Sequence, residues 1–268
     1  MLWLCSVAQK SLQSPKIEHS FFYKICMMDT TQDTLLVERR SGLLWLTLHR
    51  PDKANALTVS MVEGLTALMQ HAITDPEIQA VLLTGSGERV FCAGVDIREQ
   101  APDGDAASQR VRRAQAMALL QDIVLDCPKP VVTVLNGTAS GAGAMLALLS
   151  DVCVAVDTAA LSLPEIDIGI ATFSGFTIAQ EIGGRAIARD LVQSGRRMPA
   201  AQALAGGLFQ AVVARGELIN TATSLAQTLG SKKQSVFSLN KQWINRGLKS
   251  ALSLAREEHA QYRGAAAH

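Results

Sequence analysis

"ASGAGAM", at residues 139–145, places almost bare backbone directly before the apolar run "LALL" at 146–149. Glycine and alanine leave the backbone open to close approach, and the first amides of a helix have no acceptor within that helix. The start of a helix also carries a partial positive charge. The stretch therefore predicts a helix over 143–150 whose first turn can bind a ligand through backbone N–H groups.

Two nucleotide-binding motifs do not fit this run. Gly141 and Gly143 match the first two glycines of the dinucleotide fingerprint, but Leu146 stands at the third position and no acidic residue closes a second strand at the expected distance. The Gly-Lys-Ser/Thr of a Walker loop is absent from the chain. Taken alone, the small residues could equally serve close packing of a helix on a strand.

The segments on either side of the run alternate between strand and helix patterns. Strands are predicted at 131–137 and 152–156, and upstream lie a hairpin over 35–48, a helix after Leu57 with Thr58 or Ser60 as its cap, and a strand at 79–85. Such alternation requires crossover connections, which predicts an α/β core.

Beyond about residue 199 the patterns become mostly helical. In the last segment one apolar stripe contains Leu239, Trp243, Leu248, Leu252 and Ala255. We expect this stripe to pack on the core or on another subunit.

Composition narrows the function classes. The chain has 268 residues, 48% of them hydrophobic, which is enough for one large domain, and its net charge of +1 with scattered basic residues argues against a nucleic-acid partner. Asp151 interrupts the longest apolar stretch, so no membrane association is expected. The cysteines have no CxxC or Cys/His ligand spacing, which favours a reducing compartment, and we predict a cytoplasmic location without a metal site. They are Cys5, Cys26, Cys92, Cys127 and Cys153.

Four motifs in the same order and spacing carry a family resemblance. They are "HRPDKANAL" (49–57), "FCAGVDIRE" (91–99), "NGTASGAGAMLALLSD" (136–151) and "PEIDIGIAT" (164–172). With them the chain resembles the crotonase family, the enoyl-CoA hydratase/isomerase group, over about residues 34–265. The resemblance implies a ClpP/crotonase-like spiral core of repeated ββα turns, with a helical C-terminal region that assembles trimers or hexamers.

The same resemblance implies a division of the chain. Residues 1–28 would form a disordered extension, residues 29–198 the spiral core with an acyl-CoA site, and residues 199–268 the helical region for oligomerisation. A coenzyme A thioester would be the substrate, and no separate cofactor is expected.

The resemblance also implies roles for individual residues. The backbone amides of Val95 and Ala142 match the positions that hold the thioester oxygen, although relatives usually carry glycine where this chain has Ala142. Val95, Asp96, Ile97, Arg98 and Ala142 match the positions that bind the coenzyme A part.

The acid–base chemistry depends on Glu165. From its sequence alone, Glu165 could be a solvated acid that shares a face with Asp167 in the alternating "EIDIGI". By its motif position it is the general base. Hydratases of the family have a second glutamate at the position of Met145, and dienoyl isomerases have an aspartate at the position of Phe173.

A single glutamate favours Δ3,Δ2-enoyl-CoA isomerisation. Two alternatives stay open, namely a hydratase that uses Glu165 alone and a non-catalytic acyl-CoA-binding protein. We further expect Asp96 to cap a helix and Asp151 to be a buried acid at a helix end, whereas His49, His71 and His259 are isolated in the sequence. Ser140 and Ser174 lack the GxSxG context of a serine hydrolase.

Overall fold

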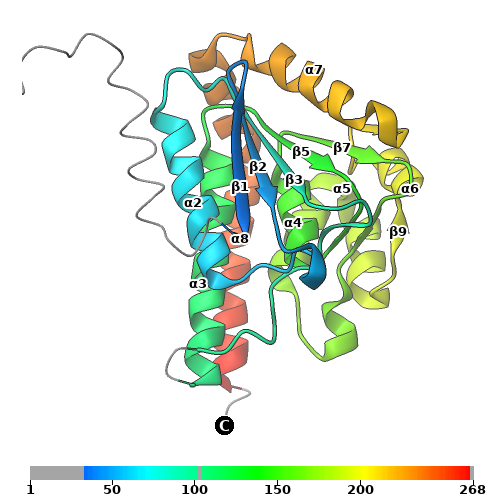
Figure 1. Cartoon of the computed structure of the whole chain (residues 1–268). Helices are drawn as coiled ribbons and strands as arrows, with labels where there is room; N and C mark the ends of the chain where they lie inside the picture. Colours follow the sequence, from blue (N-terminus) through cyan, green and yellow to red (C-terminus); the bar gives the residue numbers. More distant parts are fainter. Residues whose placement is uncertain (1–32, 102–103, 266–268) are drawn as a thin grey trace, which may run out of the picture.

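The computed structural model describes residues 33–101 and 104–265 (Figure 1). The predicted extension at 1–28 lies outside these residues. Two β-sheets form the framework. The larger sheet has six strands in the order β1-β2-β3-β5-β7-β10, and the smaller has four in the order β4-β6-β8-β9.

The larger sheet begins with the predicted hairpin. Strands β1 (Leu35–Arg40) and β2 (Leu43–Leu48) pair antiparallel, and every later neighbour is parallel: β3 (Ala80–Gly85), β5 (Val131–Leu135), β7 (Val152–Val156) and β10 (Ala211–Val213). All residues of β5 and β7 are buried. This explains their continuous apolar sequences, because strands of a parallel sheet are covered on both faces.

Each turn of the chain then adds one strand to each sheet. β3 is followed by β4 (Val90–Cys92), β5 by β6 (Thr138–Ser140), and β7 by β8 (Ala160–Ser162). These second strands pair in parallel as β4-β6-β8. Helices α3 (Ala106–Asp126), α4 (Ala142–Leu149) and α5 (Phe173–Ser194) complete the three turns. The predicted spiral of ββα turns is therefore confirmed.

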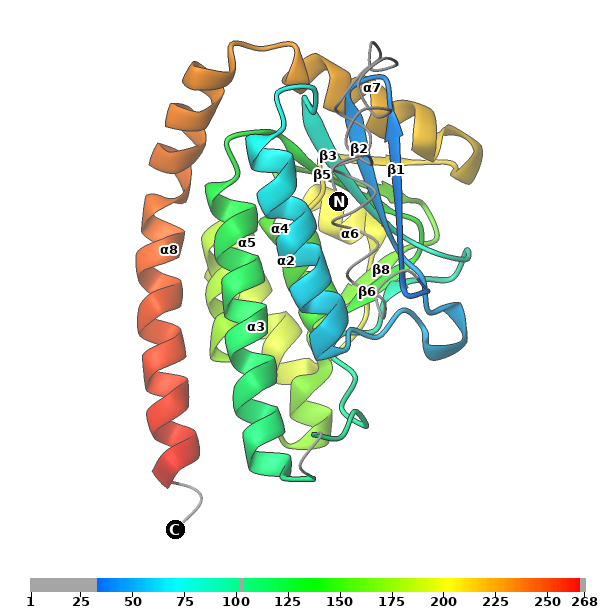
Figure 2. The ribbon, with the colours of Figure 1, turned by 60° about the vertical axis from the view of Figure 1, so that its left-hand side comes forward.

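Helices cover the sheets on several sides (Figure 2). Helix α2 (Val59–Thr74) contacts α3, β1 and β3, and α7 (Leu218–Gly230) crosses β3, β5 and β7. Thr58 caps α2 by accepting a hydrogen bond from the Met61 amide at 3.2 Å. No helix of the described residues has the length and apolar composition needed to cross a membrane.

The chain after residue 199 is mostly helical, as expected, but it also returns to the core. It contains α6 (Ala200–Ala205), the sheet strand β10, the 3-10 helix η3 (Arg215–Glu217), α7 and the long α8 (Gln234–Ala265), while β9 (Met198–Pro199) pairs with β8.

The apolar stripe of α8 divides into two parts. Leu248, Leu252 and Ala255 are buried, and α8 lies along α3 and α5, whereas Leu239 and Trp243 are exposed. Lys241 anchors the helix through an ion pair of 2.6 Å with Asp151, which also accepts the Val131 amide. Asp151 is thus the buried acid at a helix end that the sequence predicts.

Candidate active site

Two glycines bring separate backbone segments into contact. Gly94 follows β4 and Gly141 precedes α4, and both have positive φ, +101° and +52°. A Cβ atom on Gly94 would lie 3.2 Å from the Ser140 carbonyl oxygen and 3.4 Å from the Ala142 nitrogen. The main chains at 94 and 141–142 therefore lie side by side, and positive φ together with close contact favours glycine at these positions.

The carboxylate of Glu165 forms the third side of this hollow. A Cβ atom on Gly141 would lie 3.2 Å from Glu165 Oε1 and 3.9 Å from the Gly94 Cα. Glu165 lies in the 3-10 helix η2 (Pro164–Ile168), directly after β8. The pairing of β6 with β8 sets this arrangement, because the Gly141 amide donates to the Ser162 carbonyl oxygen at 3.0 Å.

Glu165 is an incompletely solvated carboxylate. Its Oε2 atom is buried without a hydrogen-bond partner. Burial raises the pKa of Glu165, although a hydrogen bond from its own backbone amide opposes the shift. A carboxyl group with a raised pKa is suited to exchange protons closer to neutral pH.

The alternating pattern "EIDIGI" does not form a strand. Because η2 is helical, Glu165 is half-buried whereas Asp167 is exposed. The interpretation of Glu165 as a solvated acid on one face with Asp167 is therefore wrong.

Two backbone amides at the hollow have no acceptor in the described part of the chain: those of Val95 and Ala142. Val95 forms a parallel bridge with Leu57 that uses the Gly94 carbonyl and the Asp96 amide, which turns the Val95 N–H away from Leu57. Ala142 is the first residue of α4, whose first amides have no acceptor within the helix. Both predicted donors are thus available for a ligand.

Met145 lies on α4, one turn beyond Ala142, and is buried. Its sulfur lies 3.8 Å from Gln121 Nε2, and a Cβ atom on Gly175 would lie 2.9 Å from its Cε. Gln121 is itself held by Arg256 of α8, which donates to Gln121 Oε1 at 2.9 Å. A thioether packed among α3, α4 and α5 therefore occupies this position.

The segment predicted to bind the coenzyme A part is only partly exposed. Ile97 and Arg98 are exposed, but the Asp96 carboxylate already bonds Arg50 at 3.0 Å and the Arg98 amide at 3.1 Å. The expectation that Asp96 caps a helix is wrong, because residues 97–98 form a turn. Glu99 caps instead, accepting the Val59 amide at the start of α2 at 3.0 Å.

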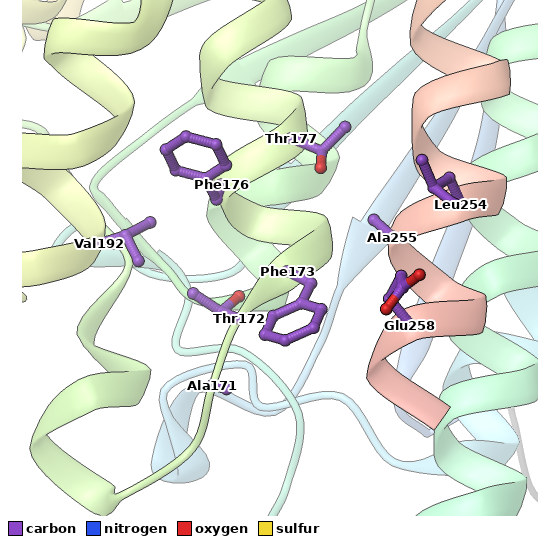
Figure 3. Close-up of a pocket in the computed structure, with 9 residues that line it drawn as sticks. All are labelled: Ala171, Thr172, Phe173, Phe176, Thr177, Val192, Leu254, Ala255 and Glu258. Carbon is purple, nitrogen blue, oxygen red and sulfur yellow. The ribbon is translucent and has the colours of Figure 1, made fainter. Parts of the chain in front are cut away.

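A mostly apolar pocket of about 510 Å³ opens between α5 and α8 (Figure 3). Phe173 and Phe176 lie on its α5 side, with Glu258 and Leu254 facing them from α8. The wall residue Thr172 connects the pocket to the interior near Met145. A Cβ atom on the neighbouring Gly175 would lie 2.5 Å from Thr172 Oγ1 and 3.4 Å from Leu163 Cδ2, as well as close to Met145.

The histidines are not collected into a metal site. Among the residues that the structure describes, no three His, Cys, Asp or Glu side chains form a group that could hold a metal ion. His49 Nδ1 lies 2.6 Å from Ser86 Oγ, His71 lies 3.4 Å from Asp75, and His259 stacks on Phe173 with ring centroids 5.0 Å apart. The buried cysteines Cys92, Cys127 and Cys153 are free thiols.

Comparisons with known proteins agree with this architecture. The family model described as enoyl-CoA hydratase/isomerase matches residues 38–267. YngF of Bacillus subtilis, named as an enoyl-CoA hydratase/isomerase, is 34% identical over 230 residues, which cover 84% of this chain and 87% of the relative. Carnitinyl-CoA dehydratase of Escherichia coli K12 is 35% identical over 198 residues, 74% of each protein.

A solved structure is similar over nearly the same length. An enoyl-CoA hydratase from Mycobacterium avium subsp. paratuberculosis superimposes with a TM-score of 0.77 at 29% identity, covering 87% of this chain and 89% of the other. The fold is thus that of the crotonase superfamily. The chain belongs to the enoyl-CoA hydratase/isomerase family.

Proposed function

We propose that the protein catalyses double-bond isomerisation of an enoyl-CoA thioester, moving the double bond from C3 to C2. The thioester oxygen would accept hydrogen bonds from the amides of Val95 and Ala142. Glu165 would remove a proton from C2, and the negative charge would move to the thioester oxygen. The same carboxyl group would then return the proton to C4, which forms the C2–C3 double bond.

Electrostatic stabilisation of the enolate is the main contribution of the hollow. Each preorganised backbone donor in a site without water contributes about 3 kcal/mol to transition-state stabilisation. The Ala142 amide is assisted by the dipole of α4. The methyl group of Ala142 leaves its N–H in place, so this departure from glycine is compatible with the proposal.

The observation that favours isomerisation is the pairing of Glu165 with Met145. Glu165 has a buried, unpartnered oxygen at the glycine hollow, while the position of a second carboxylate is filled by a thioether. One carboxylate suffices for a proton shuttle between C2 and C4, whereas methionine can neither deprotonate nor orient a water molecule strongly.

Hydration of a 2-enoyl-CoA is the second candidate. It is favoured by relatives named as enoyl-CoA hydratase and carnitinyl-CoA dehydratase. In this case Glu165 would activate water alone, with the water held by another group. A non-catalytic acyl-CoA-binding protein is the third possibility, and the available amides at Val95 and Ala142 would serve it equally well.

A panel of 2-enoyl-CoA and 3-enoyl-CoA esters distinguishes these functions. Isomerisation predicts conversion of 3-enoyl esters to 2-enoyl esters with little formation of the 3-hydroxy product. Rapid hydration by the unmodified protein would contradict the isomerase proposal. Binding of the esters without conversion of any of them would favour the acyl-CoA-binding protein.

A further inference from the structure

The segment that contains Val95 is fastened to residues 54–57 on both sides of the Val95 amide. Ala93 N donates to the Ala54 carbonyl at 3.0 Å, Leu57 N donates to the Gly94 carbonyl at 2.8 Å, and Asp96 N donates to the Leu57 carbonyl at 2.8 Å. The direction of the Val95 N–H therefore depends on the position of residues 54–57.

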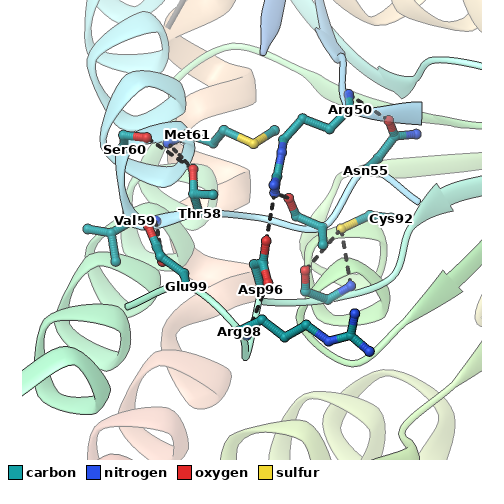
Figure 4. Close-up of polar contacts among 12 residues, drawn as sticks. Arg50, Asn55, Thr58, Val59, Ser60, Met61, Cys92, Asp96, Arg98 and Glu99 are labelled. Atoms are coloured by element: carbon teal, nitrogen blue, oxygen red, sulfur yellow. Dashed lines mark hydrogen bonds and ion pairs between the residues drawn. The ribbon is translucent and has the colours of Figure 1, made fainter. Parts of the chain in front are cut away.

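Arg50 joins these two segments with one side-chain atom. Its Nη1 donates to the Ala56 carbonyl oxygen at 2.7 Å and to Asp96 Oδ2 at 3.0 Å (Figure 4). The side chains of Arg50 and Asp96 are only 18% and 16% exposed. An ion pair that is partly shielded from water and supported by a second hydrogen bond holds its geometry better than an exposed pair.

The loop that carries the Arg50 contacts has unusual backbone geometry. Ala54 and Asn55 both have positive φ, +50° and +54°. The buried Asn55 side chain accepts the Arg50 amide at 3.0 Å and donates to the carbonyl oxygens of Ser86 and Val90 at 2.9 and 3.0 Å. Because this conformation is intrinsically unfavourable, it persists only where neighbouring contacts determine it.

We propose that Arg50 is a positioning residue, which orients the Val95 amide by holding Asp96 against Ala56. This inference rests on the proposed function, in which the Val95 amide binds the thioester oxygen. Arg50 acts through Asp96, the residue next to Val95, and does not itself contact the substrate. Misplacement of a reacting group by about 1 Å can cost about a hundredfold in rate, so a loosened amide would slow the chemical step.

The test replaces Arg50 by methionine, which keeps much of the length of the side chain and removes its donors. We expect kcat to fall by about 10- to 100-fold while KM stays within about threefold, because the lost interaction is one that strengthens in the transition state. Arg50→Lys keeps the charge but not the planar donor geometry, and an intermediate kcat is expected.

A spectroscopic readout separates positioning from general stability. With a bound acyl-CoA whose thioester carbonyl is labelled with carbon-13, the infrared stretch should shift down in the unmodified protein. In Arg50→Met it should return towards its value in solution. Arg39→Met is the matched control, because Arg39 forms an ion pair of 3.1 Å with Asp75, a residue outside the hollow. It should leave both kcat and the carbonyl stretch unchanged.

A double-mutant cycle tests the route through Asp96. Asp96→Asn keeps an oxygen for the Arg98 amide and removes the charge that pairs with Arg50. If the pair acts as a unit, Arg50→Met combined with Asp96→Asn should lower kcat no further than the stronger single variant. Should Arg50→Met not fold, Arg50→Lys and Asp96→Asn carry the same test.

The outcomes are distinguishable from a failure of the proposed function. An unmodified protein that neither turns over enoyl-CoA esters nor shifts the carbonyl stretch would refute the proposed function itself. An active protein whose Arg50 and Asp96 variants keep kcat and the shifted stretch would overturn the positioning role. A lower melting temperature with an unchanged carbonyl stretch would likewise show a structural role only.

Discussion

Glu165 combines burial, a missing hydrogen-bond partner and close contact with glycine backbone. A group of this kind destabilises the folded protein when it is charged, because it has given up water without gaining a partner. Its raised pKa expresses the same cost. The destabilisation is typical of active sites, where function determines the residue.

The pH dependence of stability follows from this shift. Because the pKa of Glu165 is raised on folding, the folded state binds a proton more readily than the unfolded state, and the contribution of Glu165 to stability is lost as pH rises through the folded-state pKa. We therefore expect Glu165→Gln to raise the melting temperature at pH 7 and to have a smaller effect at pH 4. Thermal unfolding at both pH values measures this, and a lower melting temperature at pH 7 would contradict it.

The position of Met145 offers a gain-of-function test. In Met145→Glu the new carboxylate would be placed near Gln121 Nε2, which now lies 3.8 Å from the sulfur. We expect measurable hydration of a 2-enoyl-CoA together with a melting temperature lowered by several degrees, since a charge is buried. Met145→Gln is the control for size and polarity, and equal hydration by both variants would show that the carboxylate is not responsible.

Individual residues show what sequence reasoning could and could not predict. The hollow around Gly141 and Glu165 could be predicted, because its residues lie in ordered motifs. The ion pair of Arg50 with Asp96 could not, since the two residues lie 46 positions apart and only the bridge between Leu57 and Val95 brings them together. The one available signal was the presence of Arg50 within the motif "HRPDKANAL".

At the scale of elements, the strands and helices of the spiral follow their apolar patterns closely. The segment "PEIDIGI" is different, because Pro164 and Gly169 confine it to a short 3-10 helix despite its strand-like alternation. The α8 stripe also exceeds what periodicity can resolve. Its pattern predicts an apolar face, but tertiary packing decides which half of that face is covered.

The pocket between α5 and α8 predicts a limit on acyl length. If the acyl chain extends past Thr172 into this space, Thr177→Phe should fill it and lower kcat/KM for long acyl esters by about fourfold for each excluded methylene. Esters with four carbons should be unaffected. Thr177→Val is the matched control, and the same loss for all chain lengths in Thr177→Phe would place the acyl chain elsewhere.

At the scale of the molecule, the uncovered half of α8 points to self-association. Leu239, Trp243 and Ile244 are 66%, 67% and 75% exposed, which is unusual for large apolar side chains grouped on one helix. We expect a trimer or hexamer, with Trp243→Glu shifting the protein towards the monomer. Ser253→Glu, at an exposed position on the same helix, is the control. Light scattering measures both, and a monomeric unmodified protein would contradict this expectation.

The central claim is that Glu165 moves a proton while the Val95 and Ala142 amides hold the resulting charge. Solvent deuterium exchange at C2 of a bound acyl-CoA tests it most directly, because exchange requires no knowledge of the natural substrate. The account predicts exchange in the unmodified protein and a decrease of about 10²- to 10⁴-fold in Glu165→Gln, with affinity kept within severalfold. Exchange that persists unchanged in Glu165→Gln, or tight binding with no exchange in either protein, would contradict it.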